Sequence, residues 1–135
     1  MRKIKEMIKT IINRLGYDLV PFTYQTHAIP RQKKIMESNQ IDLVLDVGAN
    51  IGNYGHKLFE MMDFNGKVIS FEPMKKEFNI LNDRCSSYPN WSAENIALGD
   101  FNGNSSINIS ENSVSSSLLD ILPDHTSSAP ASKFI

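Results

Sequence analysis

The feature that most constrains this chain is a short aliphatic segment, residues 41–47, that runs directly into a glycine-rich loop. The segment has the length and the apolar character of a buried strand in a parallel sheet. The loop begins at Gly48 and ends at Gly52, and residues 54–62 have the pattern of a helix. A strand, a glycine turn and a helix in this order predict the first unit of a doubly wound α/β sheet.

The same alternation of strand and helix then repeats along the chain. Residues 67–71 predict a second strand, Pro73 starts another helix, and residues 91–98 predict a third strand. Residues 105–110 are expected to return as a hairpin partner. This order predicts a Rossmann-like fold with a parallel sheet in a three-layer α/β/α arrangement. Three core strands are few for this class, so we expect a domain that is truncated after the third core strand and the hairpin.

The first 39 residues are interpreted as a separate helical region and linker. Apolar residues recur at helical spacing from Ile4 to Leu15, and Gly16 follows them as a helix stop. Arg and Lys surround this stripe, and residues 1–40 hold eight basic against three acidic side chains. Two roles are open for this helix: a brace on the following domain, or peripheral contact of residues 2–15 with an anionic membrane surface. A second short helix is predicted to open at Pro30.

Composition excludes several classes of partner and location. The formal net charge of −1 argues against nucleic acid as a partner of the whole chain. No stretch approaches the roughly 18 consecutive apolar residues of a membrane span. A single cysteine, Cys85, fits a reducing compartment, so we expect a cytoplasmic protein that is at most membrane-peripheral. The histidines are far apart in sequence, and their spacing predicts no metal site.

The loop after the first strand carries the residue types of a ligand site. Gly48 and Gly52 allow a ligand to approach the backbone closely, and Asn50 tolerates a left-handed backbone where a G-x-G-x-G loop has its middle glycine. Asp46, at the strand end, is placed to accept a hydrogen bond from a cationic amine or a bound water. A tight turn without any ligand is the alternative interpretation of these four residues.

A second acidic residue favours a nucleoside ligand. Glu72 closes the next strand, 20 residues after Gly52, where a carboxylate can bridge the two hydroxyls of a ribose. The phosphates of a dinucleotide seek bare N–H groups at a helix start, and Asp46 would repel them. A sulfonium cofactor with an amino-acid tail accepts an acidic strand end. Electrostatics therefore favours S-adenosylmethionine over NAD.

Four ordered motifs then carry a family resemblance. They are Asp46–Tyr54, Ser70–Pro73, Asn95–Asp100 with Gly103, and Ser113–Leu119. Over residues 40–122 the chain resembles the FkbM-type methyltransferases. The resemblance implies a class I methyltransferase fold, with residues 40–135 as a partial S-adenosylmethionine-binding domain. Family members typically methylate hydroxyls of sugars, glycolipids or other small metabolites.

The candidate cofactor-binding residues are Asp46, Gly48, Asn50, Gly52, Glu72, Asn95 and Ala97. By resemblance, Asp46, Gly48 and Asn50 line the methionine end, Glu72 binds the ribose, and the last two lie near the adenine edge. The family continues with a fourth core strand and an acidic-glycine motif that this sequence lacks, so no catalytic residue is assigned. Two alternatives remain open: an oxidoreductase that binds NAD or FAD, and a non-catalytic fragment or binding module.

Overall fold

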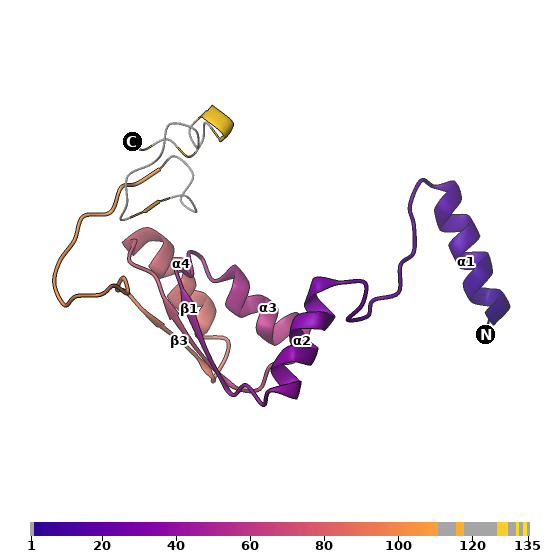
Figure 1. Cartoon of the computed structure of the whole chain (residues 1–135), viewed down its shortest axis with the longest axis horizontal. Coiled ribbons are helices and arrows are strands. Elements are labelled where there is room, and N and C mark those ends of the chain that lie inside the picture. Colours follow the sequence, from indigo (N-terminus) through magenta and orange to yellow (C-terminus); the bar gives the residue numbers. More distant parts are fainter. Residues whose placement is uncertain (1, 111–115, 118–126, 130–131, 133, 135) are drawn as a thin grey trace.

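The computed structural model describes residues 2–110, 116, 117, 127–129, 132 and 134. Within these residues the chain is a small α/β structure with four α-helices and one three-stranded parallel sheet (Figure 1). In chain order the elements are α1 (Arg2–Arg14), α2 (Ala28–Ser38), β1 (Leu43–Val47), α3 (Asn53–Met62), β2 (Lys67–Phe71), α4 (Lys75–Cys85) and β3 (Trp91–Glu94). The predicted alternation of strands and helices is confirmed.

The sheet has the order β1-β2-β3, and the register of its pairs defines two faces. Paired residues in a parallel sheet point to the same side, and successive residues of a strand alternate between sides. One side, here called the covered face, consists of Val44, Asp46, Val68, Ser70, Trp91 and Ala93. The other side, here called the open face, consists of Leu43, Leu45, Val47, Lys67, Ile69, Phe71, Ser92 and Glu94.

The core lies between the covered face and the two crossover helices. Leu58 and Met62 of α3 and Leu81 and Cys85 of α4 are buried there. They form one cluster with Ala49, Val68 and Trp91, and Ile29 and Met36 of α2 pack against its margin. Burial of this apolar surface, at about 25 cal/mol per Å², is the main term that stabilises the unit.

The open face has no helical layer among the residues that the structure describes. Leu45 is 55% exposed and Val47 is 59% exposed. Both crossovers move the chain in the same direction along the sheet, and right-handed crossovers then place both helices on one side. The described part of the chain therefore has two layers, and the expected three-layer arrangement is wrong for it.

The third strand is shorter than predicted, and the expected hairpin does not form on it. β3 ends at Glu94, which pairs with Phe71, the last residue of β2. Residues 95–98 extend beyond that end, so they have no neighbouring strand to pair with. Within residues 105–110, Asn108 forms an isolated antiparallel bridge with Ser117 and Ser110 forms one with Phe134. The predicted partner of β3 is therefore wrong.

Two helix starts also differ from the prediction. α4 begins at Lys75 rather than Pro73, because the carboxylate of Glu72 accepts the N–H of Met74 and holds that residue in an extended conformation. α2 begins at Ala28, which places Pro30 within its first turn. Proline is tolerated there because the first N–H groups of a helix have no intrahelical acceptor.

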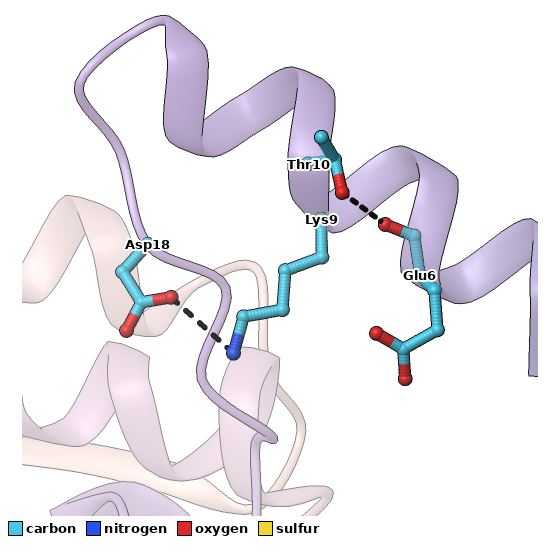
Figure 2. A network of polar contacts seen from close by, with 4 residues as sticks. All are labelled: Glu6, Lys9, Thr10 and Asp18. Carbon is cyan, nitrogen blue, oxygen red and sulfur yellow. Dashed lines mark hydrogen bonds and ion pairs between the residues drawn. The ribbon is translucent and has the colours of Figure 1, made fainter.

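Helix α1 stands apart from the sheet at the end of an extended arm (Figure 1). It stops as predicted: Gly16 has a φ of 84°, and the N–H groups of Gly16 and Tyr17 bond to the carbonyls of Asn13 and Ile12, as in a Schellman turn. Figure 2 shows its local polar contacts, with Lys9 paired to Asp18 at 3.6 Å. None of the described helices has the length and apolar character needed to cross a membrane.

Candidate functional site

The glycine-rich loop lies at the carboxyl end of β1, where a doubly wound sheet forms its ligand crevice. Three alternate residues take the left-handed conformation, with φ of 76° at Gly48, 50° at Asn50 and 80° at Gly52. The left-handed conformation expected for Asn50 is confirmed. Its side-chain oxygen also accepts the N–H of Ile51 at 2.9 Å. The loop thus turns sharply and leads into the first turn of α3.

Backbone hydrogen bonds fix this loop onto the end of β2. The N–H groups of Gly48 and Ala49 both donate to the carbonyl of Phe71, at 3.0 and 3.1 Å. The next N–H, that of Asn50, donates to the carboxylate of Glu72 at 2.7 Å. Three consecutive amides are therefore held by the neighbouring strand, and the loop is preorganised.

The two outer glycines of the loop have different roles. A Cβ at Gly48 would meet no atom within 4 Å, so the space above this residue is open. A Cβ at Gly52 would lie 2.7 Å from the Leu81 side chain and 3.0 Å from the Trp91 ring. Gly48 therefore leaves room for a ligand, whereas Gly52 lets α3 pack closely on the sheet.

Glu72 occupies the position expected at the end of β2, but its carboxylate is engaged by the protein itself. One oxygen accepts the N–H of Asn50 and the other accepts the N–H of Met74 at 2.8 Å. The residue is only 3% exposed. Charge-assisted bonds of this kind are strong, so Glu72 braces the loop in this conformation. A contact with a ribose requires the buried carboxylate of Glu72 to become exposed, and that contact stays a prediction.

Asp46 is a half-buried carboxylate on the covered face. Its Oδ2 accepts a hydrogen bond from Ser70 Oγ at 3.1 Å, and Ser70 Oγ accepts one from Trp91 Nε1 at 2.9 Å. Burial raises the pKa of Asp46, and the Ser70 hydroxyl partly offsets that rise. Neither of the ion pairs formed by the described residues involves Asp46. A bound cationic amine would stabilise the ionised carboxylate.

The two adenine-edge candidates differ in how the structure holds them. The side-chain amide of Asn95 donates to the carbonyls of Glu72 and Pro73, at 2.8 and 3.0 Å, and so joins the ends of β2 and β3. Ala97 lies exposed in the irregular segment after β3. The carboxyl edge of the sheet thus brings together the loop, Glu72 and Asn95, whereas Ala97 has no such link.

Two further residues of this site were not among the sequence candidates. Ser70 lies directly beside Asp46 in the sheet register, and Trp91 lies beneath Gly52 and Gly55. The available signal for Ser70 was its polar side chain inside an aliphatic strand. Parallel pairing of the two strands places that side chain next to Asp46. The position of Trp91 depends on the packing of α3, which the sequence pattern did not predict.

A hollow of about 420 Å³ lies at the opposite, amino end of the sheet. Asp42, Phe64 and Gly66 are among its lining residues. Its lysine, Lys33, is already paired with Asp63 across α2 and the end of α3. Its two left-handed residues, Gln40 and Asp63, follow the ends of α2 and α3 and form no glycine-rich loop. We therefore place the candidate site at the carboxyl edge.

Comparison of the chain with models of known protein families, with curated proteins and with solved structures found no match.

Proposed function

We propose that this chain holds the methyl donor of an S-adenosylmethionine-dependent O-methyltransferase, whose acceptor is a hydroxyl of a sugar, glycolipid or other small metabolite. The observation that carries the proposal is the fixed left-handed loop at the end of β1, next to the half-buried carboxylate of Asp46. The motif resemblance to the FkbM-type methyltransferases supports the same assignment. A class I methyltransferase fold is part of this proposal.

The charge of the site favours a sulfonium donor over a dinucleotide. Asp46 lies two residues before Gly48, where the pyrophosphate of NAD would approach the start of α3. A carboxylate there repels phosphate, and no described basic side chain is ion-paired to it. The ammonium group of an amino-acid tail would instead offset the desolvation of Asp46.

Methyl transfer asks little covalent chemistry of the protein. Bound S-adenosylmethionine would supply an activated methyl group to the acceptor hydroxyl, whose proton a base would take. The protein mainly holds the two reactants in line. The loop, Asp46 and Asn95 account for the donor side of this arrangement, and the acceptor side has no assigned residue.

Isothermal titration calorimetry with S-adenosylhomocysteine tests the proposal. The full chain should bind this sulfide and not NADH. Asp46→Asn should weaken binding about 10- to 100-fold, because a hydrogen bond to a charged group is lost. Asp42→Asn, the same change at the residue just before β1, is the matched control and should leave binding unchanged. Binding of NADH without binding of the sulfide would contradict the proposal.

One observation favours a second candidate, a non-catalytic binding module. Both oxygens of Glu72 are occupied by backbone amides, and the residue is buried. If Glu72 stays buried, no nucleoside can reach this carboxylate. The same calorimetry separates the two candidates, since a non-catalytic module would bind neither the sulfide nor NADH.

A further inference from the structure

Helix α1 presents an apolar stripe that the rest of the described chain leaves uncovered. The stripe consists of Ile4, Met7, Ile8, Ile11, Ile12 and Leu15. Five of these side chains are between 44% and 68% exposed, and Ile12 is partly exposed. The brace role would require the stripe to pack on the domain, and it does not do so in this conformation. A contiguous exposed apolar surface of this kind marks an interaction site.

Basic residues border the stripe on both sides. At 3.6 residues per turn, Lys5 and Lys9 follow one edge, and Lys3 and Arg14 follow the other. Glu6, the single acid of the helix, lies on the opposite side from the stripe. Long basic side chains in such positions keep their charge in water while their stems cover apolar surface. The helix therefore suits a surface that has an apolar interior and a negatively charged outer layer.

The arm that follows α1 also carries exposed apolar side chains, and its one acid, Asp18, is paired with Lys9 of the helix. Tyr17, Leu19, Val20 and Phe22 are all exposed, and they come directly after the turn at Gly16. Aromatic side chains with a polar tip, such as tyrosine, suit the boundary between an apolar and an aqueous phase. The exposed apolar region thus continues past the helix and includes the side chains that an interface favours.

We propose that α1 and this arm bind an anionic lipid surface, with the helix lying in its plane and the stripe facing the acyl chains. The open face of the sheet is the alternative partner for the stripe, and its charges argue against it. Lys67 and Glu94 lie at the two ends of that face, and their charges cancel, so it offers no negative field to the four basic residues. Anionic headgroups do offer one. With 13 residues in α1, binding is reversible.

Vesicle co-sedimentation of the full chain tests the proposal. The chain should bind vesicles of phosphatidylcholine with phosphatidylserine, and bind vesicles of phosphatidylcholine alone far more weakly. Each basic residue near the surface changes the partition coefficient about fivefold. The double change Lys3→Gln and Lys5→Gln, which leaves the Lys9–Asp18 pair intact, should therefore weaken binding about 25-fold, and high salt should weaken it as well.

Two substitutions by aspartate separate the stripe from the charge. Thr10→Asp adds one negative charge away from the stripe and should cost only the roughly fivefold of that charge. Ile8→Asp adds the same charge and also removes an aliphatic side chain that would be buried in the bilayer, which should cost about tenfold or more beyond it. Neither change should alter the melting temperature without vesicles, because both side chains are exposed.

Three outcomes would overturn the proposal. One is equal binding to the two kinds of vesicle, or binding to neither. Another is a lower melting temperature for Ile8→Asp but not for Thr10→Asp, since that would show the stripe packed within the chain. The third is a dimer in sedimentation velocity that Ile8→Asp dissociates, in a chain that does not bind vesicles, since the stripe would then join two copies.

Discussion

The two faces of the sheet are made by alternate residues of the same three strands, yet they have opposite surroundings. On the covered face, Val68 and Trp91 are buried beneath α3 and α4. On the open face, Leu43, Leu45 and Val47 are about half exposed. β1 has aliphatic residues on both sides, and its one polar residue, Asp46, lies on the covered side, so its composition does not predict which face is packed. The handedness of the crossovers decides which face the helices cover.

The two faces also differ in their polar residues. The covered face contains Asp46 and Ser70 near its carboxyl end, joined to Trp91 by hydrogen bonds. The candidate site therefore lies at the carboxyl end of the covered face. Packing and ligand binding are expected to be coupled there, whereas substitutions on the open face should affect neither strongly.

The largest expected effect is the difference in unfolding free energy between the same substitution on the two sides of the sheet. Leu81→Ala removes a fully buried side chain of α4 and should lower the free energy of unfolding by about 2–5 kcal/mol. Leu45→Ala, on the open face, should lower it by less than about 1 kcal/mol. Urea titration followed by the fluorescence of Trp91, the single tryptophan, measures both. Equal losses would mean that the open face is also packed.

A smaller effect is expected where α3 contacts the covered face. A Cβ at Gly55 would lie 2.3 Å from the Trp91 ring. Overpacking costs about 1–3 kcal/mol, and the better helix propensity of alanine returns up to about 1 kcal/mol. Gly55→Ala should therefore be destabilising in thermal unfolding. Gly99→Ala is the control, with no atom near its Cβ and an expected change within about 0.5 kcal/mol. A Gly55→Ala variant with an unchanged melting temperature would contradict this packing.

The smallest effect concerns pH. Burial raises the pKa of Asp46 in the folded chain, so the folded state keeps this proton at pH values where the unfolded state has lost it. The contribution of Asp46 to stability is therefore largest in acid and declines as the pH rises through the window between the two pKa values. Asp46→Asn should remove this decline. Unfolding free energies of both chains, measured from about pH 3 to 7, test it; parallel curves would contradict it.

Much of the strand and helix order could be predicted, because it depends on local patterns. The bounds of β2 are those predicted, and α3 begins one residue early, at Asn53. The left-handed residue at Asn50 also followed from local chemistry, since few side chains tolerate that conformation. These features depend only on residues that are close together in the sequence.

The remaining features depend on contacts between distant residues. The early end of β3 depends on where β2 ends, and the open face depends on crossover handedness. The hydrogen bonds from Asn50 and Met74 to Glu72 depend on the loop and the end of β2 meeting in space. The resemblance assigned Glu72 to a ligand, whereas the structure uses it first as a brace. The serine-rich motif at residues 113–119 falls largely outside the described residues.

The most direct test of a donor site at the carboxyl edge is to locate the bound ligand. Amide chemical shifts from ¹⁵N-labelled chain, recorded during titration with S-adenosylhomocysteine, report that position residue by residue. A donor site at the carboxyl edge predicts saturable shifts at Gly48, Asn50 and Gly52, and none at Asp42 or Gly66 beside the hollow at the amino end. Shifts confined to the hollow, or no shifts at a saturating concentration, would contradict a donor site at the carboxyl edge.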